Sequence, residues 1–151
     1  MATNLLHSSA IRRRTNQRSH RGPSARVAEL NVGQKMIPDK QRLTATVARV
    51  DAMLHAGEYA ELERLSGGVR LTAEEMKSAI EDYPEKLAAR PTYDFSEGEV
   101  VYISGSAPAE WSVYLHLWRK NGGCSDLSAE LTIIDTAAGL YRVQVDDIRV
   151  L

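Results

Sequence analysis

Six side chains that could bind a ligand or move a proton lie at alternating positions near the end of the chain: Tyr114, His116, Trp118, Glu130, Arg142 and Asp146. His116 could act as a general base if Glu130 or Asp146 oriented its imidazole. Tyr, Trp, His and Arg are also the residue types enriched at protein interfaces. We therefore expect a partner-binding face formed by these six residues. A small-molecule-binding or hydrolase-like site with a pocket near His116 is the alternative.

No other pattern in the sequence specifies catalysis or a metal. The chain has no phosphate-binding glycine loop, no Cys/His ligand spacing and no Gly-flanked nucleophilic serine. Asp146 and Asp147 are adjacent in an expected strand, so their carboxylates point to opposite faces unless a bulge intervenes. The single cysteine, Cys124, cannot form an internal disulfide. We expect no cofactor, no metal and a role in binding rather than catalysis.

Side-chain alternation with period two predicts the strands that position these residues. The pattern covers three runs near the end of the chain, 111–119, 128–134 and 140–150, and a short β-prone run at 99–104 precedes them. One face of the resulting sheet is aliphatic, and the other carries the six candidate residues. Short connections between the last three runs favour hairpins.

Helical periodicity predicts the elements before the sheet. From Asp39 onward the apolar residues Leu43, Val47, Val50 and Leu54 recur at helical spacing and form one stripe. The charged residues Arg42, Arg49 and Asp51 lie on the opposite side of the expected helix. A second short piece follows Gly57 and stops at Gly67-Gly68, and Thr72 with Glu75 fits a capping box for a third helix reaching about Tyr83. The sequence thus predicts an α+β fold with N-terminal amphipathic helices packed on one face of a sequential antiparallel sheet of about four strands.

Charge is distributed unevenly between the two ends of the chain. Of 151 residues with a net charge of -1, residues 1–35 carry six Arg, one Lys and one Glu (+6), which leaves -7 for residues 36–151. Residues 1–35 are therefore expected to form a disordered basic tail, and residues 36–151 a single α+β domain. The tail is open to three interpretations: a targeting leader, a nucleic-acid-binding arm through Arg12, Arg13 and Arg14, or an extension without function that precedes a start at Met36.

The same composition bears on compartment and partner. No stretch approaches the roughly 18 apolar residues that a membrane span needs, and one cysteine is compatible with a reducing compartment. We expect a cytoplasmic protein that does not associate with membranes. Its acidic domain would suit a basic protein partner.

Four short strings resemble a family of small, uncharacterised bacterial domains: residues 65–75, 111–113, 125–127 and 145–148. The likeness covers residues 40–151. The pattern of these residues is similar to that of the cystatin-like and NTF2-like α+β group. Some small acidic proteins of this kind are immunity proteins that block toxins. The resemblance implies helices on a curved antiparallel sheet and supplies no catalytic residue. It favours a non-catalytic protein-binding module, of an immunity or regulatory type.

Overall fold

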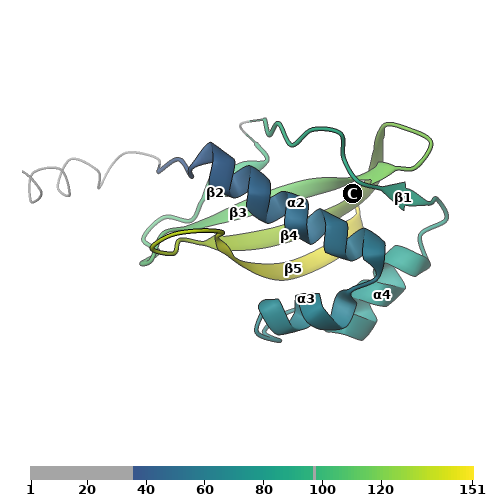
Figure 1. Cartoon of the computed structure of the whole chain (residues 1–151), viewed down its shortest axis with the longest axis horizontal. Coiled ribbons are helices and arrows are strands. Elements are labelled where there is room, and N and C mark those ends of the chain that lie inside the picture. Colours follow the sequence, from purple (N-terminus) through teal and green to yellow (C-terminus); the bar gives the residue numbers. More distant parts are fainter. Residues whose placement is uncertain (1–35, 97) are drawn as a thin grey trace, which may run out of the picture. The chain divides into compact units, whose positions relative to one another are not determined.

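The computed structural model of the protein describes residues 36–96 and 98–151. Within them, three helices precede five strands: α2 (Lys40–Ala56), α3 (Tyr59–Leu65), α4 (Ala73–Glu81), β1 (Leu87–Ala88), β2 (Val100–Tyr102), β3 (Glu110–Arg119), β4 (Cys124–Ile134) and β5 (Arg142–Val150) (Figure 1). The expected α+β class is therefore confirmed. The tail predicted for residues 1–35, with its arginine cluster, lies outside the described residues.

Local capping explains where the helices begin and end. The Asp39 carboxylate accepts the backbone N–H of Arg42 at 2.9 Å, so α2 starts immediately after it. Gly57 ends this helix at φ 73°, a conformation that a residue with a Cβ adopts at a cost. Thr72 and Glu75 form the predicted capping box, which starts α4. α4 ends at Glu81, slightly before the predicted end at Tyr83.

β3 is the central strand of an antiparallel sheet. β4 pairs with one edge of β3, and β5 follows β4. The other edge of β3 is shared, because β2 pairs with its first half and β1 with its last two residues. Strand β1 was not predicted, since a two-residue strand is too short to show alternation. β4 begins at Cys124, four residues earlier than the predicted start at Ser128.

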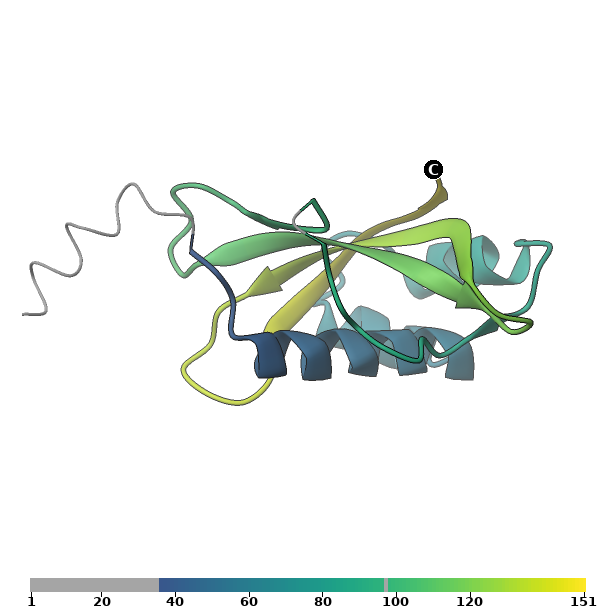
Figure 2. The ribbon, with the colours of Figure 1, turned by 90° about the horizontal axis from the view of Figure 1, so that it is seen from above.

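The helices cover one face of this sheet. α2 runs along that face, and α3 and α4 follow it near β5 (Figures 1 and 2). The core between the layers contains the apolar stripe of α2 and the aliphatic positions of the strands, among them Val47, Leu54, Met76, Val113, Leu115, Leu131, Ile133 and Val145. None of the three described helices lies over the opposite face, which we call the open face.

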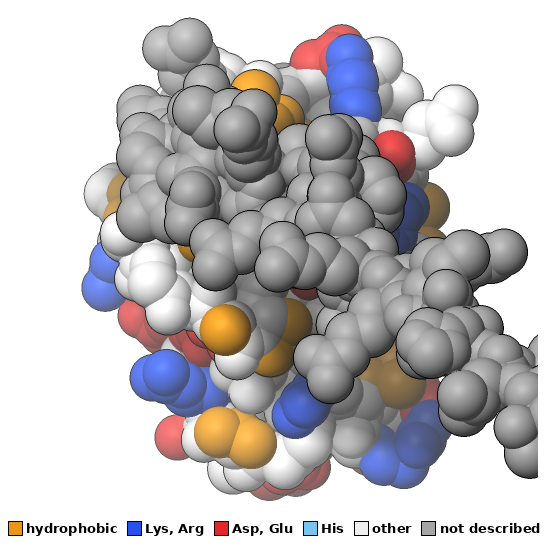
Figure 3. Space-filling view, turned by 90° about the vertical axis from the view of Figure 1, so that its left-hand side faces the viewer, with side chains coloured by type: hydrophobic (Ala, Val, Ile, Leu, Met, Phe, Trp, Pro, Cys, Tyr) orange, Lys and Arg blue, Asp and Glu red, His pale blue; other side chains and the backbone are white. Residues whose placement is uncertain are grey.

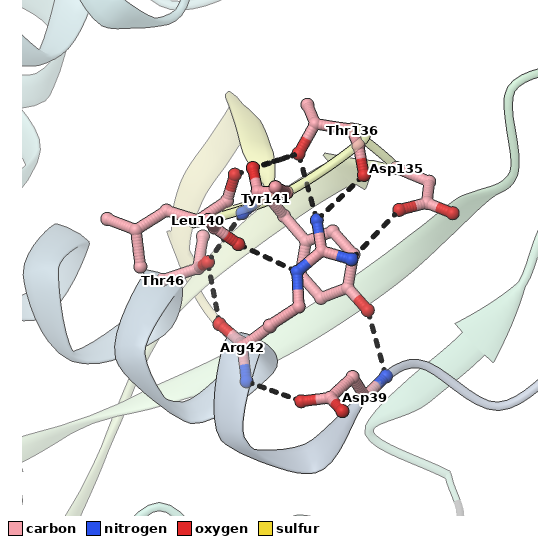
Figure 4. Close-up of polar contacts among 9 residues, drawn as sticks. Asp39, Arg42, Thr46, Asp135, Thr136, Leu140 and Tyr141 are labelled. Carbon is pink, nitrogen blue, oxygen red and sulfur yellow. Dashed lines mark hydrogen bonds and ion pairs between the residues drawn. The ribbon is translucent and has the colours of Figure 1, made fainter.

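Arg42 fastens the start of α2 to the loop between β4 and β5 (Figure 4). Its Nε donates to the Gly139 carbonyl at 2.7 Å, and its Nη1 donates to Asp135 at 3.2 Å. Its Nη2 donates to both the carbonyl and the hydroxyl of Thr136, each at 2.9 Å. The guanidinium also lies 4.1 Å from the centre of the Tyr141 ring, a cation–π arrangement. The loop backbone thus receives its hydrogen bonds from a helix almost one hundred residues earlier in the chain.

Further hydrogen bonds support this connection. The Tyr141 backbone N–H donates to the Thr46 hydroxyl at 3.0 Å, and the Tyr141 hydroxyl accepts the Asp39 N–H at 2.8 Å. The indole N–H of Trp111 donates to the Met36 carbonyl at 2.9 Å. The helix start, the β5 start and the β3 start are therefore held as one unit.

Two charged residues of α2 do not lie on the solvent side that helical periodicity predicts. Asp51 is fully buried, and Arg42 is only partly exposed. Periodicity assigns polar residues to solvent by type alone, whereas both side chains have polar partners that come from distant segments. The prediction of an exposed polar stripe was wrong at these two positions.

We expect Arg42→Lys to lower the free energy of unfolding by about 2 kcal/mol. A lysine ammonium cannot reproduce the planar guanidinium, which donates hydrogen bonds to three loop residues. The matched control is Arg49→Lys, on the exposed surface of the same helix, which should change stability by less than about 0.5 kcal/mol. Chemical denaturation of both variants measures the difference. Equal stability of the two variants would contradict the role assigned to Arg42.

Candidate functional site

The strand register orders the open face into rows that cross the sheet. The two central rows are Tyr114–Glu130–Asp147 and His116–Ser128–Arg149. Directly opposed residues on one face have Cβ atoms about 5 Å apart, so members of a row can interact. The register thus brings three of the six predicted residues, Tyr114, His116 and Glu130, into one cluster.

His116 is the centre of this cluster. Its Nδ1 shares a hydrogen bond of 2.8 Å with the Ser128 hydroxyl, and its Nε2 lies 3.9 Å from a carboxylate oxygen of Glu99. Its backbone carbonyl accepts from Arg90 at 3.4 Å. Hydroxyl, imidazole and carboxylate therefore follow one another as in a nucleophilic triad. However, Ser128 is only 3% exposed, so its hydroxyl is not presented to a substrate.

A β-bulge places both adjacent carboxylates of β5 on the open face. The pairing of β4 with β5 shifts by one residue after Glu130, and the Asp146 carboxylate accepts the Thr132 hydroxyl at 2.5 Å. Arg149 lies 3.4 Å from Asp147 and 3.7 Å from Glu130. An extra residue in one strand changes which face the next side chain takes. Divergence of Asp146 and Asp147 was expected only for a strand without a bulge, and the bulge in β5 is the stated exception.

This acidic group still does not make a metal centre. Its carboxylates are engaged by Thr132 and Arg149, and Arg70 lies 3.5 Å from Asp146. Within residues 36–96 and 98–151, no three His, Cys, Asp or Glu side chains are placed to hold a metal ion together.

The remaining predicted residues lie away from the centre. Asp146 borders it through Thr132. Trp118 is at one end of the sheet, paired with Cys124 and with Ala88 of β1. Arg142 is exposed at the other end, opposite Ile134. The six predicted residues share a face but do not form one compact site.

Four members of the central cluster were not among the predicted site residues: Glu99, Ser128, Asp147 and Arg149. Ser128 is visible in the alternation of β4, but a serine without a recognisable motif does not by its type alone indicate a site. Asp147 and Arg149 follow the bulge, which alternation alone does not reveal. Glu99 precedes β2, and only the pairing of its carbonyl with the Tyr114 N–H, at 2.8 Å, brings it beside His116.

Apolar side chains border the acidic centre on the β2 side. Val101 is 47% exposed and is paired with Ser112, a residue of the open face. Ile103 is 36% exposed and hydrogen-bonds through its backbone to Glu110, two residues earlier in β3. The open face therefore combines exposed aliphatic groups, aromatic rings and carboxylates.

A buried polar network connects α2 to this face. Asp51 accepts the Tyr93 hydroxyl at 2.6 Å and the Arg90 N–H at 3.1 Å, and His55 lies 3.1 Å from its second oxygen. Burial alone would raise the pKa of Asp51, but the hydrogen bonds from His55, Tyr93 and Arg90 outweigh it and hold the pKa below its usual value. Burial and then the neighbouring carboxylate raise the pKa of Tyr93. Because Arg90 also binds the His116 carbonyl, Asp51 helps to position the open face from behind.

Figure 3 shows the end of the domain that carries the start of α2. Where side chains are coloured in Figure 3, hydrophobic groups form separate patches between charged ones.

Among the described residues, no helix has the length and apolar character to cross a membrane.

The chain belongs to the family described as Domain of unknown function (DUF7668), whose model matches residues 52–151. The match begins inside α2 and includes all strands of the open face. The expectation of an uncharacterised domain family is confirmed. No curated protein and no solved structure matches the chain.

We expect Asp51→Asn to destabilise the protein by about 1–3 kcal/mol at neutral pH, because the hydrogen bonds then end on a neutral acceptor. The pKa of Asp51 is lower in the folded than in the unfolded state, so its contribution is complete above the ordinary value of 3.8 and is lost as pH falls through the folded pKa. The deficit of the variant should therefore shrink as pH falls below 3.8. Urea denaturation of both proteins across this pH range measures it.

The control is Asp94→Asn, because that side chain is 80% exposed. This variant should follow the wild type at every pH. A deficit of Asp51→Asn that does not change with pH would show that the buried carboxylate is not held in its charged form.

Proposed function

We propose that the protein is a non-catalytic, cytoplasmic binding module that captures a basic protein partner through the open face. The observation that carries the proposal is the sheet face that none of the described helices covers, on which paired strands present rows of aromatic, acidic and aliphatic side chains. A sheet face that no helix covers is usually polar and solvated. Here exposed Val101 and Ile103 lie beside carboxylates, a mixture that favours protein contact.

Charge supports a basic partner. The domain from residue 36 onward carries -7, and the open face contributes Glu99, Glu130, Asp146 and Asp147. Arg149 neutralises this group in part. An acidic surface accelerates association with a basic one and suppresses acidic competitors.

Rigidity also favours binding. The His116 ring is held at Nδ1 by the Ser128 hydroxyl, its backbone carbonyl accepts from Arg90, and its side chain is 33% exposed. Side chains held in one conformation lose less entropy when a partner covers them. Tyr114 beside it, and Trp118 at the end of β3, supply aromatic contact area.

The resemblance to small bacterial domains with a cystatin-like or NTF2-like pattern suggests what kind of partner this is. We propose an immunity-type or regulatory role, in which the acidic face covers the basic surface of a toxin or enzyme. In this role the bound surface, rather than any group-transfer chemistry, produces the effect.

A hydrolase-like site at His116 is the second candidate. It is favoured by the spatial order of hydroxyl, imidazole and carboxylate in Ser128, His116 and Glu99. Two observations weigh against it. The Ser128 hydroxyl is buried, and the carboxylate is 3.9 Å from the imidazole, beyond hydrogen-bond distance.

The full-length protein, immobilised, should retain a stoichiometric partner from native lysate, and Tyr114→Ala combined with Trp118→Ala should release it. Removal of aromatic contacts at an interface weakens binding by about thirtyfold or more, which is 2 kcal/mol. Circular dichroism of the double variant checks that its fold is intact. Unchanged capture by a folded double variant would eliminate the open face as the binding surface.

A matched pair of charge variants tests the electrostatic part. Glu130→Gln with Asp147→Asn removes two charges from the open face, and Glu58→Gln with Glu74→Gln removes two exposed charges from the helical side. The first pair should weaken binding to the captured partner by about tenfold and the second by less than about twofold. Equal losses would mean that total charge, and not this face, attracts the partner. Titration calorimetry at two salt concentrations measures both.

A fluorophosphonate probe, which reacts with nucleophilic serines, should not label the wild-type protein, because Ser128 is shielded. Mass spectrometry of the intact chain reads the result. Labelling that Ser128→Ala and His116→Ala both abolish would support the hydrolase-like site instead.

A further inference from the structure

A groove separates α4 from the last part of β5, on a different surface from the open face. We call it the α4–β5 groove; it has a volume of about 430 Å³, and the residues used below are Ala79, Asp82, Pro84, Leu127, Ile148 and Val150. Ala79 and Asp82 lie on and just after α4, whereas Ile148 and Val150 belong to β5. The groove therefore has α4 as one wall and the ends of β4 and β5, the last strand of the sheet, as the other.

The edge of β5 beside this groove has backbone groups that no described residue pairs with. The Leu151 N–H donates to the Asp126 carbonyl at 3.0 Å, so in an antiparallel ladder Arg149 and Asp147 also bond to β4, opposite Ser128 and Glu130. The N–H and C=O groups of Ile148 and Val150 consequently point away from β4. No hydrogen bond from another described residue reaches them.

At Val145, the same edge of β5 is covered by the segment between α3 and α4. Its backbone groups also point away from β4, but its carbonyl accepts the Leu71 N–H at 3.3 Å and its N–H donates to the Ser66 hydroxyl at 2.9 Å. The segment between α3 and α4 thus closes the edge at Val145 and leaves it open from Ile148 onward. An open strand edge pairs readily with another extended chain.

We propose that the α4–β5 groove binds an extended peptide segment, which adds to β5 as a further strand and directs a basic side chain toward Asp82. Addition of a peptide to a sheet edge beside a helix is a general mode of recognition, in which main-chain hydrogen bonds give affinity and the groove walls give specificity. The proposal concerns a second surface and does not depend on the function assigned to the open face.

The side chains of the groove define the segment. Ala79, Leu127 and Pro84 line it with apolar surface suited to a small aliphatic side chain. Asp82 has no described cation within ion-pair distance, whereas nearby Arg149 is already paired with Glu130 and Asp147. A peptide that alternates aliphatic and basic residues would satisfy both walls.

α4 makes a single extended segment a better occupant than a second copy of the chain. If the β5 edges of two copies paired around a two-fold axis, each would bring its own α4 to the same edge. One isolated strand fits between α4 and β5 without this conflict.

The test uses full-length protein and an acetylated, amidated peptide of alternating valine and lysine, with amide hydrogen exchange followed by nuclear magnetic resonance. Without peptide, the Ile148 and Val150 amides should exchange rapidly, and those of Asp147 and Arg149 slowly. Peptide should slow exchange at Ile148 and Val150 by about tenfold or more. The same peptide N-methylated at every residue should have no effect, because neither of its edges keeps an N–H that can donate to β5.

Variants of the groove provide the second measurement. Val150→Pro removes an outward N–H without removing a bond to β4, a position at which edge strands tolerate proline, and Val150→Thr keeps that N–H. Peptide affinity should fall by about tenfold for Val150→Pro and for Asp82→Asn, and by less than about twofold for Val150→Thr. Unchanged amide shifts of β4 confirm that the sheet is intact.

Four outcomes would overturn the proposal. The first is no protection of Ile148 and Val150 at saturating peptide, and the second is equal binding of the N-methylated peptide. The third is protection that rises with protein concentration alone, which would identify a second copy as the occupant. Shifts confined to Tyr114 and Glu130 would likewise reject the groove and locate the basic peptide on the open face, so the two surfaces are distinguished.

Discussion

The contact between the Arg42 guanidinium and the β4–β5 loop is the constraint on which the arrangement of this domain depends. Four hydrogen bonds and a stacked Tyr141 ring join residues almost one hundred positions apart. The loop carbonyls have no hydrogen-bond partner in a helix or strand and would otherwise bind water. The charged guanidinium donates to them instead. Once the start of α2 is held there, its apolar stripe must cover the aliphatic face of the sheet. None of the described helices then covers the polar residues of the opposite face, so this helix-to-loop contact helps to determine which face of the sheet the helices leave open.

Much of this fold could be predicted because the two hydrophobic periods are strong in the sequence. The repeat from Leu43 to Leu54 and the alternation from Trp111 to Leu117 each identify an element and its buried side. Capping residues such as Thr72 fix helix starts locally. Register cannot be predicted in this way, because it follows from pairing between strands. The alignment of His116 with Ser128, and the bulge after Glu130, therefore appeared only in three dimensions.

Polar residues were the least predictable, since periodicity treats them all as solvent-facing. Asp51 is buried because Tyr93, forty-two residues later, and the Arg90 N–H both donate to it. A carboxylate without such donors would have to remain in water. The same Arg90 binds the His116 carbonyl, so the candidate site is supported by a network that begins on α2. Candidate sites identified from residue type alone omit such supporting groups.

The two proposed surfaces would recognise different chemistry, and they meet at Arg149. The open face would select a partner by side-chain charge and shape, because the backbone of β3 and β4 is already paired. The α4–β5 groove would select an extended conformation, because its free groups belong to the backbone of Ile148 and Val150. The Arg149 side chain lies between Glu130 and Asp147 on the open face, and its neighbours on both sides in the chain form the groove edge.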